Sequence, residues 1–74
     1  MIISKELLEY LHKDTKRPNK YFLELIAVNE VGGFEVMYKM IEMADIPSKG
    51  KINFKKKILR LEDIYKTFLN QSND

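Results

Sequence analysis

Three breaks divide the sequence into four segments whose apolar residues recur at helical spacing. Pro18 and Pro47 each remove a backbone donor and restrict the residue before them, and Gly32-Gly33 can take the left-handed geometry of a helix end. Between these breaks, apolar side chains return every three or four residues, the period of one helix face. The sequence therefore predicts an all-α fold, a small bundle of four short helices or of three helices plus a short connector.

The first two helices have candidate caps. Ser4 can cap a helix that reaches about Lys13, because its hydroxyl can accept a free amide hydrogen bond of the first turn. Asn19 can cap a second helix from Lys20 to about Glu30. This second segment has few polar positions, so we expect it to be the most buried of the four helices.

The second half of the chain predicts two further helices. One should run from Phe34 to about Ala44, and the Pro47–Lys51 segment should be a turn or an exposed loop. Asn53 can then cap the last helix, Phe54 to about Leu69. We expect residues 71–74 to fray at the end of a single domain that spans residues 1–74.

The apolar stripes predict one core. Met37 and Met40 lie on the stripe of the third helix, whereas Met43 lies off it and should be exposed. The side chains expected to meet in one cluster are Leu8, Leu11, Leu25, Ile26, Met37, Ile41, Leu61 and Tyr65.

Composition restricts the chemistry. The chain has no cysteine and one histidine, His12, so it has no disulfide and cannot build a metal site from histidine and cysteine. No segment approaches the roughly 18 apolar residues of a membrane span, and the N-terminus does not resemble a signal peptide. These features predict an intracellular protein (cytoplasm, or nucleus in a eukaryote) without a cofactor. Self-association would add buried area to so small a core.

Charge is strongly segregated along the chain. The net charge is only +2, but residues 49–60 carry +6, residues 13–20 carry +3 and residues 21–48 carry −4. Such segregation creates a local field and predicts an anionic partner. The bases expected to contact phosphates are Lys49, Lys51, Lys55, Lys56, Lys57 and Arg60, with Lys16, Arg17 and Lys20 as a second strip if the fold brings it close.

Several interpretations of the basic segment stay open. Phosphate backbones bind to such clusters by counterion release and charge-assisted hydrogen bonds. A solvated helix face would look the same in sequence, and an acidic protein or a membrane surface would also be attracted. The glycine turn suggests a helix-turn-helix, but the helix after it carries Glu35 and Glu42, which face phosphates badly. A plain helical hairpin is the simpler interpretation there.

A family resemblance points in the same direction. An apolar helix leads into a glycine pair, and the last helix ends with a leucine, a tyrosine, an aromatic residue and a leucine at fixed spacing: Val31-Gly32-Gly33-Phe34, then Leu61, Tyr65 and Phe68-Leu69. In these features Leu25 to Leu69 resembles a shortened AT-rich interaction domain (ARID). The family's tryptophan is absent, and Glu62 stands where a basic residue is expected. The resemblance implies DNA binding through the Pro47–Asn53 loop and the start of the last helix.

Catalytic motifs are missing from the sequence. The glycine pair lacks the spacing of a nucleotide-binding loop, and His12 is expected on the surface of the first helix. We therefore expect a small non-enzymatic module that binds nucleic acid, DNA more than RNA, or acts in regulation. The alternative is a protein-binding adaptor or inhibitor, which docks on an acidic protein surface or pairs with itself.

Overall fold

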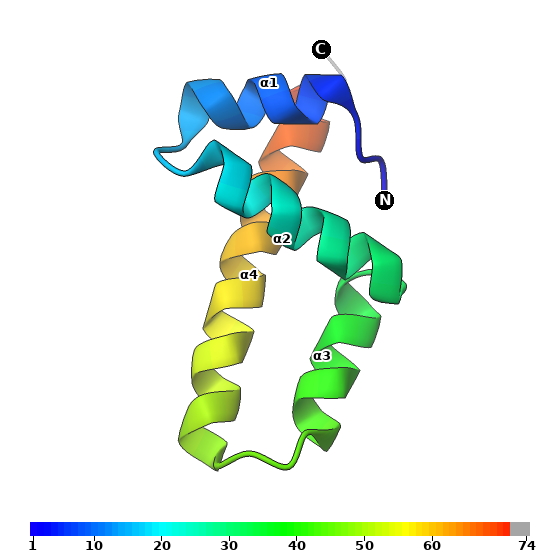
Figure 1. Ribbon diagram of the computed structural model, residues 1–74, viewed down its shortest axis with the longest axis vertical. Coiled ribbons are helices and arrows are strands. Elements are labelled where there is room, and N and C mark those ends of the chain that lie inside the picture. The colour runs from blue at the N-terminus through cyan, green and yellow to red at the C-terminus, as the bar shows by residue number, and fades with distance from the viewer. Residues whose placement is uncertain (72–74) are drawn as a thin grey trace.

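The computed structural model describes residues 1–71 of the chain, and these form four helices and no strand (Figure 1). The helices are α1 (Lys5–Asp14), α2 (Pro18–Val31), α3 (Phe34–Met43) and α4 (Ser48–Gln71). The predicted all-α bundle is therefore confirmed. Residues 72–74, which belong to the tail expected to fray, lie outside the described range, and Gln71 is the last residue of α4.

Helix α4 forms the long axis of the molecule, and the other helices pack on its two halves (Figure 1). The antiparallel pair α1 and α2 crosses its C-terminal half, whereas α3 runs beside its N-terminal half. The result is an elongated bundle with extents of 40 × 23 × 19 Å. No helix of the described part of the chain is long and apolar enough to cross a membrane.

Local signals at two helix ends act as the sequence predicts. The Leu7 amide donates to the Ser4 hydroxyl at 3.3 Å, which caps α1. Gly32 ends α2 with a φ of 115°, and the Gly33 amide donates to the Val28 carbonyl at 2.9 Å. Only glycine takes this left-handed geometry at little cost. A side chain at Gly32 would also lie 3.1 Å from Val36 Cγ2.

The start of α2 differs from the prediction. The helix begins at Pro18, its N-cap is Arg17, and Asn19 is already inside the first turn. Proline is favoured at the first helical position, because the amide it lacks would have had no helical partner. Helix α2, which we expected to be the most buried of the four, buries Leu25 and Val28, whereas its Leu23 is 65% exposed.

The last helix begins earlier than the sequence predicts. Ser48 is its first residue, and the Lys51 amide donates to the Pro47 carbonyl at 3.1 Å. The expected Pro47–Lys51 loop is therefore the first helical turn, and Asn53 lies inside the helix instead of capping it. Gly50 in this turn packs near Ile46, whose Cδ1 lies 3.7 Å from an added Cβ.

The core forms where the α1–α2 pair and α3 meet α4. Leu11, Leu25, Ile41, Leu61 and Tyr65 are buried, as predicted. Three other predicted members, Leu8, Ile26 and Met37, are only half-buried, and Met40 is 49% exposed. Helix α4 supplies the largest share of the buried set, which consists of Leu7, Leu11, Leu25, Val28, Ile41, Ile58, Leu61, Tyr65 and Phe68.

Aromatic rings continue this core along α4. The ring centroids of Phe34 and Tyr65 lie 6.2 Å apart, and those of Tyr10 and Phe68 lie 5.6 Å apart. The Tyr65 hydroxyl also accepts a hydrogen bond from the Ile2 amide at 2.7 Å. The extended N-terminal residues are thereby attached to the last helix.

Candidate nucleic-acid interface

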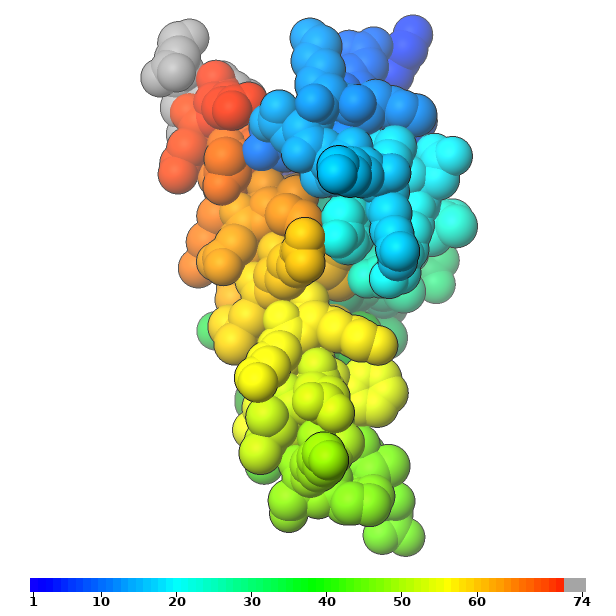
Figure 2. Space-filling view, turned by 90° about the vertical axis from the view of Figure 1, so that its left-hand side faces the viewer, coloured from blue at the N-terminus to red at the C-terminus, as the bar shows by residue number. Residues whose placement is uncertain are grey.

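Two basic segments that are far apart in the sequence meet at one groove. The turn between α1 and α2 lies beside the middle of α4, shown in blue to cyan and in yellow in Figure 2. The groove between them has a volume of about 790 Å³. The basic side chains that line it are Lys16, Arg17, Lys20, Lys57 and Arg60.

The local structure explains this placement. Lys16 and Arg17 occupy the connection that Pro18 ends, so both side chains project from the turn rather than from a helix face. Lys57 and Arg60 are one turn apart on α4 and face away from Ile58, which is buried in the core. Packing of α2 against α4 then brings the two pairs to the walls of one groove.

The groove is positive overall. Its lining contains five basic side chains against two acidic ones, Asp14 and Glu24. Glu24 lies 3.7 Å from the Lys20 ammonium, and the two side chains are 35% and 52% exposed. Within residues 1–71, Lys16, Arg17, Lys57 and Arg60 form no ion pair. Four cations are thus left to attract a ligand anion.

A tyrosine ring lies in the wall of the groove. The Arg60 guanidinium carbon lies 5.9 Å from the centre of the Tyr21 ring, and the Lys20 ammonium lies 6.0 Å from it. Both distances are within the range of cation–π attraction. The ring is half-buried and packs against the core. Sequence reasoning treated Tyr21 only as part of an apolar helix, because nothing in the sequence reveals that Arg60 lies near it.

Two bases of the predicted set turn toward α3 instead. The Lys51 ammonium donates to the Glu42 carbonyl oxygen at 2.6 Å, and Lys55 pairs with the Glu42 carboxylate. These contacts hold the start of α4 against the end of α3. The structure does not bring Lys51 and Lys55 to the groove.

The remaining two bases lie on the outer surface of α4. Lys49 and Lys56 are exposed and seven residues apart, so they share a helix face, and Arg60 follows four residues later. This exposed row extends the positive field from the groove toward the N-terminal end of α4, where the helix dipole is also positive. Asp63, one turn after Arg60, ends the row.

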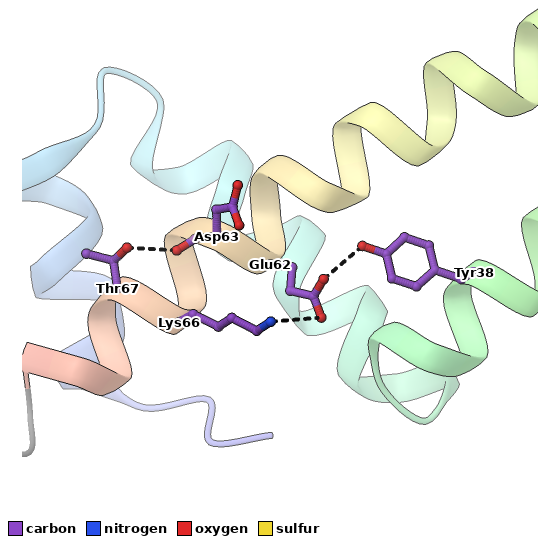
Figure 3. A network of polar contacts seen from close by, with 5 residues as sticks. All are labelled: Tyr38, Glu62, Asp63, Lys66 and Thr67. Carbon is purple, nitrogen blue, oxygen red and sulfur yellow. Dashed lines mark hydrogen bonds and ion pairs between the residues drawn. The ribbon is translucent and has the colours of Figure 1, made fainter.

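A polar network joins α3 to α4 on the other side of the helix (Figure 3). The Tyr38 hydroxyl donates to Glu62 Oε1 at 3.0 Å, and the Lys66 ammonium lies 3.9 Å from Glu62 Oε2. Burial, and then the bond to Glu62 and its charge, raise the pKa of Tyr38 from 10.0 to about 12. Glu62 stands where the ARID resemblance expects a basic residue, and its carboxylate accepts the hydrogen bond from Tyr38 that joins α3 to α4.

A second, apolar groove lies beside this network. It has a volume of about 480 Å³ and is lined by Tyr38, Lys39, Glu42, Met43, Lys55 and Leu59. Met43 is 85% exposed, as predicted, and Leu59 is 50% exposed. His12 is exposed on α1, and residues 1–71 contain no group of three or more metal-ligating side chains that could hold an ion.

Comparisons with protein-family models, with curated proteins and with solved structures gave no match to this chain. The resemblance to an ARID therefore stays a prediction from the sequence.

Proposed function

We propose that this protein is a small non-enzymatic module that binds nucleic acid, DNA more than RNA, at the groove between the α1–α2 turn and α4. One observation carries the proposal. The groove collects five basic side chains from two segments about 40 residues apart. Four of these side chains have no ion-pair partner within the described residues. Unpaired cations around a concave surface focus the field that attracts a polyanion.

The exposed row on α4 supports the same function. Lys49, Lys56 and Arg60 follow one helix face, so their positive ends can contact successive phosphates along a backbone. Lys51 and Lys55 contribute less in this arrangement, because Glu42 already holds both. The proposal therefore assigns the phosphate contacts to the groove and the outer row.

A charge-reversal experiment tests the proposal. Lys57→Glu together with Arg60→Glu changes the net charge from +2 to −2 and reverses the α4 wall of the groove. Nucleic-acid binding at low salt should be lost. The single changes Lys57→Gln and Arg60→Gln should each make the negative slope of log K against log salt shallower by about 0.9 on duplex DNA. Fluorescence anisotropy with labelled DNA and RNA at several salt concentrations measures both effects.

The matched control is Lys5→Glu together with Lys39→Glu. Both lysines are exposed and lie outside the groove, and the net charge again becomes −2. This variant should retain most of the binding. If both double variants weaken binding alike, the attraction is diffuse charge, and the groove has no special role.

The apolar groove favours a second candidate function, a protein-binding adaptor that pairs with a second copy of itself. Its rim carries Glu42 together with Lys39 and Lys55, so the surface has both signs of charge. A surface with both signs can face itself across a two-fold axis. Absence of nucleic-acid binding at low salt, together with a sedimentation coefficient that rises with protein concentration, would favour this candidate.

A further inference from the structure

The aromatic ring in the basic groove has no role in simple phosphate binding. Phosphates need only positive donors, yet Tyr21 lies among the basic side chains of the groove. Its ring centre is 5.9 Å from the Arg60 guanidinium carbon. The ring is fixed by its packing against the core, so little conformational entropy would be lost when a ligand contacts it. Tyrosine and arginine are among the side chains on which unpaired nucleobases stack.

The shape of the site distinguishes single strands from duplexes. The five basic side chains line a hollow of about 790 Å³, which is within the range of about 300–1,000 Å³ that holds a small molecule. A duplex keeps its nucleobases paired and stacked inside, so it can offer such a hollow its backbone but no free base face. A single strand can offer phosphates and a free base together.

We propose that the groove binds a single-stranded segment of nucleic acid, with one unpaired base against Tyr21 and Arg60. The flanking phosphates contact Lys16, Arg17 and Lys57. This inference rests on the proposed function and deepens it, because it names the strand state of the ligand. Stacking is tolerant of base identity, since every base has an aromatic face, so the site has little sequence preference.

Oligonucleotides that differ only in their bases test the inference on the unmodified protein. The ligands are labelled oligo(dT) of about ten nucleotides, a length typical of single-strand sites, oligo(U) of the same length, an abasic strand of the same length, and a duplex with the same number of phosphates. Either oligo(dT) or oligo(U) should bind about 5- to 150-fold more tightly than the abasic strand, which is the range measured for one stacked base. The duplex should bind more weakly than the better single strand.

A tyrosine variant provides the second test. Tyr21→Leu keeps an apolar side chain against the core but removes the ring, and it should weaken single-strand binding about 5- to 150-fold without changing the salt slope. Binding of the abasic strand should not change. The matched control is Tyr10→Leu, because Tyr10 is also half-buried but packs against Phe68 outside the groove. It should bind as the unmodified protein does. Circular dichroism checks the fold of both variants.

The possible results separate the two proposals. If the abasic strand or the duplex binds as tightly as the single strands, the stacking proposal is overturned and the proposed nucleic-acid function stands. The same holds if a folded Tyr21→Leu variant binds normally. If no nucleic acid binds at low salt, both proposals fall.

Discussion

At the scale of single residues, the bond between Tyr38 and Glu62 makes stability depend on pH. Burial and the neighbouring carboxylate raise the pKa of Tyr38 to about 12, because both disfavour the phenolate. In the unfolded chain the same group titrates near 10.0. Below pH 10 both states keep the proton, so the hydrogen bond stabilises the fold in full. Between pH 10 and about 12 only the unfolded state releases the proton, and this stabilisation is lost.

Tyr38→Phe tests this pH dependence. At pH 8 the variant should be less stable by about 0.5–1.5 kcal/mol, the usual contribution of one hydrogen bond. Between pH 10 and 12 its stability should fall less than that of the unmodified protein. Urea unfolding followed by circular dichroism at both ends of this range measures the difference.

Glu62→Gln is the matched control, because the amide can still accept the bond but has no charge. It should reduce the alkaline loss only in part. An equal alkaline loss in Tyr38→Phe and in the unmodified protein would contradict the assignment to Tyr38.

At the scale of helices, the start of α4 differs most from the sequence prediction, since the helix begins at Ser48 instead of Phe54. The Pro47–Lys51 segment contains proline, serine and glycine, which together predict a loop. In the structure the Pro47 carbonyl accepts the first helical bond, and Lys51 and Lys55 are held by Glu42 of α3. Local composition could not reveal a partner on another helix. These contacts outweigh the weak helix propensity of Gly50.

Gly50→Ala tests whether this turn is helical. Gly50 has no left-handed geometry, and an added Cβ would be in ordinary contact with Ile46 at 3.7 Å. The variant should therefore be more stable by about 0.4–1 kcal/mol, because alanine restricts the unfolded chain and favours the helix. Thermal and urea unfolding measure the change.

Gly32→Ala provides the contrast. Its φ of 115° and the approach of Val36 Cγ2 to 3.1 Å make the same substitution strained. It should destabilise the protein by about 1 kcal/mol or more. If Gly50→Ala also destabilises, the helical start of α4 is incorrect.

At the scale of the whole molecule, stability depends on the one helix that contacts every other part. Leu61 of α4 is 1% exposed and lies in the cluster that joins α4 to α1, α2 and α3. Leu61→Ala should cost about 2–5 kcal/mol, a large share of the stability of a domain this small. The matched control is Leu59→Ala on the same helix, where the side chain is 50% exposed. Its cost should be below about 1 kcal/mol in the same urea titration. Equal costs would show that the buried face of α4 is wrongly assigned.

The sequence was sufficient for the fold class and for some of the residues that line the candidate site. Helical periodicity and the stops at Pro18 and Gly32-Gly33 are local signals, so they could be recognised without tertiary contacts. The charges were also visible in the sequence. The sequence did not reveal which lysines line the groove and which contact α3. Lys55 pairs with Glu42 of α3, whereas Lys57, two residues later on the same helix, lines the groove. The proposed role of Tyr21 likewise depends on Arg60, which is 39 residues away.

The groove also connects binding to folding. Its walls come from the α1–α2 turn and from α4, so the proposed binding site does not exist in the unfolded chain. A ligand of the groove therefore shifts the folding equilibrium toward the native state by mass action. At a free ligand concentration of about 100 times Kd, this linkage adds about 2.7 kcal/mol to the free energy of unfolding. Since the total stability of a domain is typically only about 5–15 kcal/mol, this linkage would be a large addition to it.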